Sequence, residues 1–466
     1  MIDRLKIWPL LIGTAVATGC AHYQPQPLEP EKIAAQYEAR RLDDEGLKIF
    51  VTTNSGGTWQ NWPTRQWDLN SLTLAAFYFN PDLAVARAQW RVAAAGVKTA
   101  GGRPNPTVTA GPGYNFSAAS GITPWMPFGA VDWPVETAGK RGKRMAEAEK
   151  IAESALWSYV SVAWQIRSGV RAARQEFSAA QARAQLLQKQ FAAQNEITRR
   201  QRQRFTAGAM ARSELVPAQL ALNKTQIELS AAQAKQADAR SRLAEALGLP
   251  LAALAGIQFQ AGPKMDFASD PTSAGMRRAA LLGRADIRAA LADYAAAEEN
   301  LRLELAKQYP DLHLNPGYQF DQGDNKWTIG FTFELPVLNQ NQGPIAESMA
   351  RRELAAAKFL QLQAQVIGAN DRAVAGFASA QAQAEVTGAQ LDLAERQLKS
   401  VAAQVSAGAA EPLDLLSAEM ELNSVRLAQL DSEAQLQSAI GALEDVLQRP
   451  ADDFAALQFL PIKSQL

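Results

Sequence analysis

The side chains best suited to covalent or metal chemistry are scarce in this sequence. Its 466 residues include one cysteine, Cys20, and two histidines, His22 and His313. A single cysteine excludes an internal disulfide framework and a cysteine-based zinc site. Two histidines leave little material for a metal centre or a Ser-His-Asp triad. We therefore expect no cofactor, no catalytic residues and no bound metal.

Motifs of the common enzyme classes are also missing. The sequence has no G-x-S-x-G and no H-E-x-x-H, and the run Gly139-Lys-Arg-Gly142-Lys lacks the spacing of a phosphate-binding loop. We interpret His313 as a polar strand residue. The 47 acidic and 47 basic residues give zero net charge, which argues against a nucleic-acid partner because phosphate binding needs a basic surface.

Cys20 could carry lipid. Residues 1–19 have a basic start, an apolar run ending at Ala17 that is too short to span a bilayer, and small residues just before the cysteine. This arrangement is similar to a bacterial lipoprotein processing site, although Leu is more usual than Ala17. We expect cleavage before Cys20, lipid on its sulfur, and anchoring in the outer membrane because Ala21, not Asp, follows. The alternative is an ordinary signal peptide with an incidental cysteine.

The sequence contains an internal duplication, and the helices and strands that would position a functional site belong to its two halves. Matching residues stand 204 apart in the earlier part of each half and 200 apart in the later part. The first group pairs Asp82 with Asp286, Trp90 with Tyr294, Pro106 with Pro310 and Pro112 with Pro316. The second pairs Phe177 with Phe377, Gly208 with Gly408, Leu215 with Leu415, Asn223 with Asn423 and Pro250 with Pro450. Each half is therefore a whole structural unit.

The same order of segments is predicted in both halves: a helix (about 71–100 and 279–308), two strands, a long helix, a glycine turn and a shorter helix (about 212–247 and 412–447). The expected divisions of the chain are a signal peptide over 1–19, an N-terminal periplasmic segment over 20–70, a first repeat over 71–258 with strands at about 106–116 and 126–135, a connecting segment over 259–278, a second repeat over 279–450 with strands at about 310–320 and 326–337, and a tail over 451–466.

The strand segments alternate strictly between apolar and polar residues. From 310 to 320 one face carries Leu312, Leu314, Pro316, Tyr318 and Phe320. Segments of about ten residues with one apolar face suit tilted strands that cross an outer membrane; a soluble hairpin with one face on a core is the alternative. Four strands cannot close a barrel, since the smallest use about eight, so several chains must share one. Prolines fit poorly inside such strands.

The long helices carry a coiled-coil seam. About 70 residues from 138 to 206 contain no proline, enough for about 100 Å of helix. Apolar residues in this stretch recur at steps of three and four, as in a coiled coil, and the second half continues the pattern. The seam residues are Ala163, Ile166, Val170, Ala173, Phe177, Ala180, Ala184, Leu187 and Phe191, then Phe377, Ala380 and Ala384. The shorter helices are expected to fold back as partners after turns at Gly208 and Gly408.

With these features the sequence resembles the TolC-like outer-membrane efflux channels over nearly the whole mature chain. The resemblance rests on the duplication, the paired strands from proline to Gly-Tyr, and the glycine turns at 208–215 and 408–415. The segment 335–343, Leu-Pro-Val-Leu-Asn-Gln-Asn-Gln-Gly, is similar to a stretch of the CzcC-like metal-efflux branch, with Leu338 and Gln340 departing from it.

The resemblance implies a mostly α fold with β, in which long coiled-coil hairpins adjoin four transmembrane strands per chain. It also implies a homotrimer with a 12-stranded β-barrel in the outer membrane of a Gram-negative bacterium, above a 12-helix α-barrel in the periplasm. Such a channel conducts passively for an inner-membrane pump, with resistance-nodulation-division the expected type, and opens when the helical tips splay.

The family's site roles fall on the helical turns. A periplasmic adaptor (membrane fusion protein) is expected to dock on the turns, at Arg204, Ala207, Gly208, Ala209, Ala407, Gly408 and Ala409. Asp414 matches an acidic position of the pore constriction, while Ser417 stands where the family has a second acid. The alternative role for Asp414 is a first-turn acid favoured by the helix dipole. A protein-secretion channel and a non-channel coiled-coil scaffold lipoprotein are the other functions left open.

Overall fold

A computed structural model of the chain describes residues 23–55, 62–64, 66–259, 275, 278 and 282–450. It divides into a unit over 1–41 and a unit over 42–466. The described part of the first unit contains helix α2 (Pro30–Glu38). The expected signal peptide, Cys20, most of the connecting segment and the tail over 451–466 lie outside the described residues.

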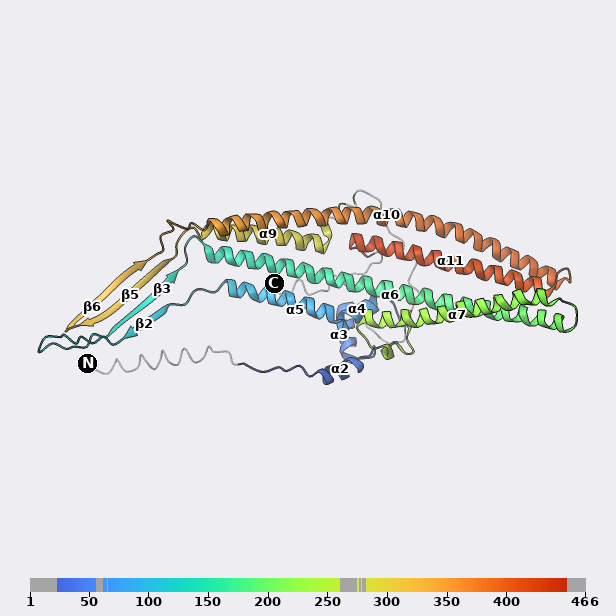
Figure 1. The fold of residues 1–466 in the computed structure, drawn as a ribbon, viewed down its shortest axis with the longest axis horizontal. Coiled ribbons are helices and arrows are strands. Elements are labelled where there is room, and N and C mark those ends of the chain that lie inside the picture. The colour runs from blue at the N-terminus through green and yellow to red at the C-terminus, as the bar shows by residue number, and fades with distance from the viewer. Residues whose placement is uncertain are drawn as a thin grey trace. The chain divides into compact units, whose positions relative to one another are not determined.

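The second unit follows the duplicated order (Figure 1). Its first half consists of α3 (Glu45–Ser55), β1 (Gln66–Trp67), α4 (Leu69–Phe79), α5 (Pro81–Ala100), β2 (Thr107–Gly111), β3 (Phe128–Val135), α6 (Lys140–Thr206), α7 (Arg212–Leu247), a 3₁₀ turn (Leu251–Leu254) and β4 (Gln258–Phe259). The second half consists of α9 (Ala285–Ala306), β5 (Leu312–Asp321), β6 (Asp324–Thr332), α10 (Gln342–Ser406) and α11 (Pro412–Leu447).

The helices keep most of the predicted bounds. Helices α7 and α11 begin and end where the pattern places them. The single helix expected over 71–100 is instead two helices, α4 and α5. The chain breaks at Asn80, whose side chain accepts a hydrogen bond from the Asp82 amide and so caps α5, with Pro81 in the first turn. Two local causes explain this break. The Asn80 side chain satisfies a free N–H at the start of α5, and Pro81 cannot continue the preceding helix.

Four strands form one antiparallel sheet in the order β2-β3-β5-β6. Strand β2 ends at Gly111 and is shorter than the expected 106–116, because the following Pro112 has no N–H for the ladder. Strand β6 ends at Thr332, before the expected 337. Pro316 lies within β5 opposite Ile329. The pairing of β5 with β3 is interrupted at Asn315 and Pro316, between the pairs Ala130–Gly317 and Trp133–Leu314. Pro316 has no N–H to donate to the ladder there.

One face of this sheet is apolar and uncovered. In β6 the side chains of Trp327 and Ile329 are 79% and 78% exposed, and Phe331 is also exposed. Thr328 and Gly330 stand between them, so the predicted alternation is present along the strand. A contiguous apolar surface of this kind marks a face that another molecule covers.

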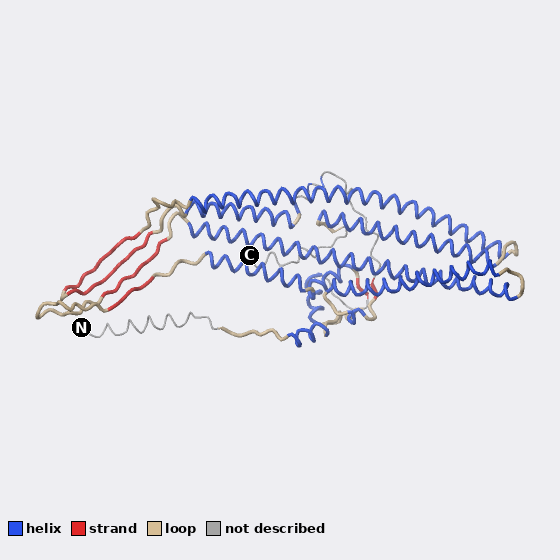
Figure 2. The backbone as a smooth tube through the Cα atoms, viewed as in Figure 1, coloured by secondary structure: helices blue, strands red, loops and turns tan. Residues whose placement is uncertain are grey.

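The long helices α6 and α10 run from the sheet at one end to the two glycine turns at the other (Figure 2). Helix α6 lies among α5, α7, α9 and α11, whereas α10 packs against α9 and α11. The predicted seam of α6 is buried from Ala163 to Leu187, and Phe191 is half-buried. Among the described helices, none has the combination of length and apolar character that membrane crossing requires.

Candidate functional site: the paired helical turns

The two glycine turns have the same geometry. Gly208 and Gly408 have φ angles of +74° and +76°, a conformation that glycine adopts without the Cβ clash of other residues. The amide of Ala209 donates to the carbonyl of Arg204 at 2.9 Å, and the amide of Ala409 donates to Gln404 at 2.8 Å. These bonds close each long helix, so that the chain can reverse into its shorter partner.

All seven residues predicted for docking are exposed, and the structure brings the first-half members close to the second-half turn. A groove of about 420 Å³ runs between the turns and is lined by Arg200, Gln201, Gln203, Arg204, Ala207, Ala209, Glu411, Pro412 and Leu413. The duplication did not predict Glu411, Pro412 and Leu413 as lining residues. The groove depends on the approach of two turns that are about 200 residues apart in sequence.

The turns differ in charge. Arginines occupy 199, 200, 202, 204 and 212 around the first turn, while the second carries Glu411 and Asp414. Arg204 lies 3.6 Å from Glu411 and forms an ion pair across the groove. Further along α6, Arg199 and Arg200 donate to Glu196 and hold its pKa at about 2. The first turn is therefore basic and the second acidic.

Asp414 is an exposed residue in the first turn of α11. Its Oδ2 accepts a hydrogen bond from the backbone N–H of Glu411 at 2.8 Å. The carboxylate thus satisfies an N–H at the helix start and stands at the positive end of the helix dipole. The alternative role of Asp414 was a first-turn acid that stabilises the helix start. This contact fits that role and accounts for an acid at this position without reference to a pore.

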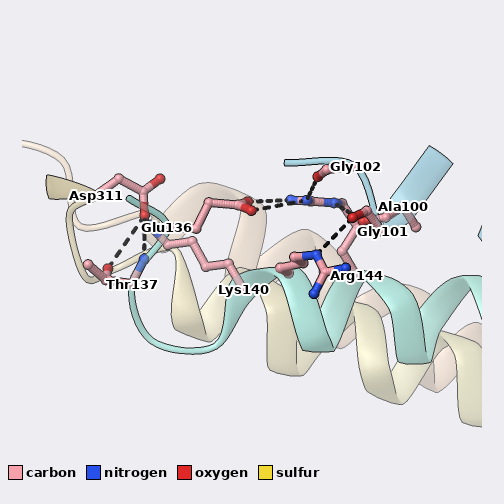
Figure 3. Close-up of polar contacts among 9 residues, drawn as sticks. Ala100, Gly101, Gly102, Glu136, Thr137, Lys140, Arg144 and Asp311 are labelled. Atoms are coloured by element: carbon pink, nitrogen blue, oxygen red, sulfur yellow. Dashed lines mark hydrogen bonds and ion pairs between the residues drawn. The ribbon is translucent and has the colours of Figure 1, made fainter. Parts of the chain in front are cut away.

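The junction between the sheet and the helices is a polar cluster (Figure 3). Lys140, at the start of α6, donates to Asp311 at 2.8 Å, and the amide of Thr137 donates to the same carboxylate at 2.9 Å. Arg144 pairs with Glu136 at 2.7 Å and donates to the Ala100 carbonyl at 2.8 Å. These contacts bind the ends of α5, β3 and the start of β5 to α6, and they fix how the strands leave the helices.

The segment 335–343, which resembles the metal-efflux branch, serves the corresponding junction in the second half. Asn341 has a φ of +62° and donates through Nδ2 to the Glu304 carbonyl and carboxylate at 2.8 and 2.9 Å. Burial works to raise the pKa of Glu304, but hydrogen bonds from Lys307 and Asn341 hold the pKa below its usual value. Asn341 therefore joins the start of α10 to the end of α9.

Two polar clusters were not predicted from the sequence. His313 Nδ1 lies 2.9 and 3.1 Å from the carboxylate oxygens of Asp132 across strands β5 and β3. His313 is therefore a polar strand residue, as expected, and its partner Asp132 becomes evident only from the pairing of the strands. In the described parts of the chain, no three side chains among His, Cys, Asp and Glu are arranged to hold a metal ion.

The second cluster joins α6 to α11. Arg171 forms ion pairs with the fully buried Glu444 and, at 2.7 Å, with Asp445. It also donates to the Gly441 carbonyl at 2.9 Å. The fully buried Arg167 lies 3.6 Å from Glu444. Sequence reasoning missed this cluster, although arginines among the inward positions of a helical seam were a usable indication.

Comparison with known proteins covers both halves of the chain. The family described as "Outer membrane efflux protein" matches residues 76–249 and 276–447. Nodulation protein T of Rhizobium leguminosarum bv. trifolii is 24% identical over 255 residues, which are 52% of this chain and 54% of that protein. The cobalt-zinc-cadmium resistance protein CzcC of Cupriavidus metallidurans is 24% identical over 323 residues, 68% of this chain and 75% of that protein.

Among solved structures, the outer-membrane channel OprN superposes with a TM-score of 0.68 at 20% identity, covering 93% of this chain and 99% of that chain. At this identity the likeness shows a shared fold. The chain spans about half the length of nodulation protein T, so its activity and partners must be argued from its own surfaces.

Proposed function

Because this chain belongs to the outer membrane efflux protein family, we propose that it is the outer-membrane channel of a tripartite efflux system. The observation that carries this proposal is the uncovered apolar face of the sheet, with Trp327 and Ile329 nearly four-fifths exposed. Lipid covers this face, and the polar face lines the water-filled path. The channel itself performs no chemistry and conducts passively.

Three copies complete the channel. A single sheet has two free edges, β2 and β6, and edge strands pair readily with further strands. Joining three four-stranded sheets gives twelve strands, within the range that closes around an aqueous pore. Helix α10 supports the same assembly, because its exposed Leu360, Val386 and Leu393 have no covering element among the described residues.

The periplasmic adaptor docks on the paired turns. The groove between them is open and is crossed by the ion pair of Arg204 with Glu411. The docking surface consists of the seven predicted turn residues together with Glu411, Pro412 and Leu413. The partner pump is of the resistance-nodulation-division type, as the resemblance of the segment 335–343 to the metal-efflux branch implies. Lipid on Cys20 adds an anchor in the outer membrane.

Asp414 narrows the pore near the turns and favours cations. In a trimer three such carboxylates surround one axis, and a ring of charges of one sign selects ions of the opposite sign. The pore opens when the turns splay, so the adaptor must bind the open state more tightly than the closed one.

Two measurements test the proposal: the molar mass of the purified particle and its ion conductance. Light scattering on the detergent-purified full chain should give a protein mass of three chains, and the same particle should form ion channels in planar bilayers. In these bilayers Asp414→Asn should reduce cation selectivity, read as a shift of the reversal potential in a salt gradient. Asparagine retains an oxygen that can accept the Glu411 hydrogen bond, so the variant removes the charge and keeps the cap.

Glu214→Gln is the matched control, because Glu214 is the first-half counterpart of Asp414 and should leave the reversal potential unchanged. A monomeric, non-conducting particle would overturn the channel proposal. Conducting trimers whose selectivity does not respond to Asp414→Asn would remove Asp414 from the constriction while leaving the channel in place.

A further inference from the structure

The apolar face of the sheet continues past the end of strand β6. The strand ends at Thr332, but Phe333 and Leu335 keep the alternation, with Glu334 between them. Both apolar side chains are exposed, like those of β6 itself. The surface that lipid covers in the proposed channel is therefore longer than the sheet.

The chain then turns towards α10 and adds two more apolar side chains (Figure 1). The amide of Val337 donates to the carbonyl of Leu335 at 2.8 Å, around Pro336. Val337 and Leu338 are 75% and 93% exposed. Proline has no N–H, and the N–H of Val337 is bonded within the segment, so neither residue needs water as an acceptor. This backbone suits a hydrocarbon surrounding, where the protein must satisfy its own N–H groups.

Polarity changes abruptly after this apolar segment. Residues 339–342 are Asn, Gln, Asn and Gln, so every side chain is an uncharged amide. The side chains of Asn339 and Gln342 accept hydrogen bonds from the backbone amides of Asn341 and Gln340 at 2.9 and 2.7 Å. Because burying polar groups in hydrocarbon is costly, the change marks the edge of an apolar layer.

The thickness of a bilayer requires more apolar residues than β6 supplies. With a rise of about 3.4 Å per residue and a tilt of about 40°, the stretch from Trp327 to Phe331 covers about 10 Å of bilayer. The apolar band of an outer-membrane barrel is about 25 Å tall. Continuing to Leu335 raises the covered height to about 21 Å, and Val337 and Leu338 supply the remainder.

The first half of the chain has no equivalent apolar segment. Gly139 and Asn341, with φ angles of +68° and +62°, precede the two long helices at matching positions. Three residues before them stand Glu136 and Leu338. Glu136 forms an ion pair with Arg144 at 2.7 Å, which ties the first connection to its own helix. The corresponding side chain in the second half is a leucine in the open.

We propose that residues 335–338 form a wedge that inserts among the phospholipid acyl chains of the periplasmic leaflet of the outer membrane. The inference rests on the proposed channel and adds to it a lipid-binding segment outside the sheet. In the trimer, three such wedges alternate with three polar junctions around the periplasmic rim of the barrel. The wedges set how deep the barrel lies in the membrane.

Fluorescence quenching tests the position of the wedge. The full-length Leu338→Cys variant is labelled with an environment-sensitive fluorophore and reconstituted in vesicles of phosphatidylethanolamine and phosphatidylglycerol. Lipids with a nitroxide near the top of the acyl chain should cause a loss of emission, whereas aqueous iodide should cause none. The matched controls are Glu334→Cys, on the opposite face, and Gln340→Cys, beyond the wedge. Both should respond to iodide and not to the lipid quencher. Labelled protein without an added cysteine corrects for reaction at Cys20.

The Ile329→Cys variant separates failure of the wedge from failure of the proposed function. Lipid quenching at Ile329 with iodide quenching at Leu338 would reject the wedge and keep the lipid-facing sheet. Iodide quenching at both positions would reject the lipid-facing sheet as well. A label at Leu338 that neither quencher reaches would mean that protein covers this segment, which also overturns the wedge.

Bilayer thickness provides a second test of the same placement. In vesicles of shorter-chain lipids the hydrocarbon layer no longer covers the whole apolar band. The label at Leu338, at the edge of the band, should then gain iodide quenching, while the label at Ile329 should remain protected. Equal responses at the two positions would contradict the placement of Leu338 at the edge.

Discussion

The two halves of the chain repeat one pattern, but only the first half encloses its long helix. Helix α6 has 19 buried residues in 67, while α10 has five in 65. Phe177 is buried and its counterpart Phe377 is half-buried. The difference arises because α11 covers α6, and no described helix of the same chain takes the equivalent place beside α10. In the proposed trimer, a neighbouring copy covers this open face of α10.

The halves also differ in what fills the equivalent seam positions. Arg167 and Arg171 of α6 face Glu444 inside the chain, whereas Ile367 and Asp371 stand at those positions in α10. Buried charges persist where each has a partner of opposite sign. The contact between α6 and α11 is thus specified by ion pairs, and the equivalent positions of α10 lack the arginines that form them.

The largest difference between the halves is expected when the two matching phenylalanines are truncated. Phe177→Ala should reduce the free energy of unfolding by about 3–5 kcal/mol, because it leaves a cavity in a closed core. Phe377→Ala should cause a smaller loss in a monomeric sample. Denaturant unfolding in detergent, followed by circular dichroism, measures both. Equal losses in the monomer would show that the two helices are equally enclosed.

Removing the buried carboxylate of Glu444 tests the contact between α6 and α11. Glu444→Ala leaves Arg167 and Arg171 without this partner in a buried site, and we expect a loss of about 3–5 kcal/mol in the free energy of unfolding. Glu433→Ala, an exposed position on the same helix, is the control and should change stability by less than about 0.5 kcal/mol. Similar effects at both positions would mean that Glu444 is not buried against α6.

The turns are the regions where the halves should behave alike. Gly208→Ala and Gly408→Ala each place a Cβ on a left-handed backbone and should each cost about 1–2 kcal/mol. Gly376→Ala in α10 is the control: it meets no atom within 4 Å and should stabilise the helix by about 0.5–1 kcal/mol. Thermal unfolding of the three variants measures the contrast, and a turn that tolerates alanine would not have the left-handed geometry.

The smallest expected effect is the pH dependence that Glu196 adds in the first half. Glu196 has a pKa of about 2 because Arg199 and Arg200 donate hydrogen bonds to it and carry positive charge. A lowered pKa stabilises the folded state fully above the usual value of 4.5, and this stabilisation is lost as the pH falls through about 2.

Carbon-13 NMR of labelled glutamate should give a titration midpoint near 2 for Glu196. The double variant Arg199→Gln, Arg200→Gln should move this midpoint back toward 4.5. The counterpart position is Arg396, so the second half has no equivalent titration. A midpoint near 4.5 in the unaltered protein would contradict the ion pairs at Glu196.

The sequence by itself determined the features that depend on local spacing. Alternation in 310–320, the three-and-four spacing from Ala163 to Leu187, and the glycines at 208 and 408 are sufficient to predict strands, a seam and turns, because each follows from the geometry of neighbouring residues. The resemblance to the efflux family follows from the same repeats. The docking role of the turn residues is what that resemblance implies, and it stays a prediction.

Tertiary structure alone decided which distant residues meet. The groove between Arg204 and Glu411, the pair of His313 with Asp132, and the arginines around Glu444 each join residues about 180 or more positions apart. Periodicity specifies which face of an element is buried, but it does not specify the partner of that face. Two halves with the same pattern can therefore differ, as α6 and α10 do, because burial depends on the neighbour that covers each helix.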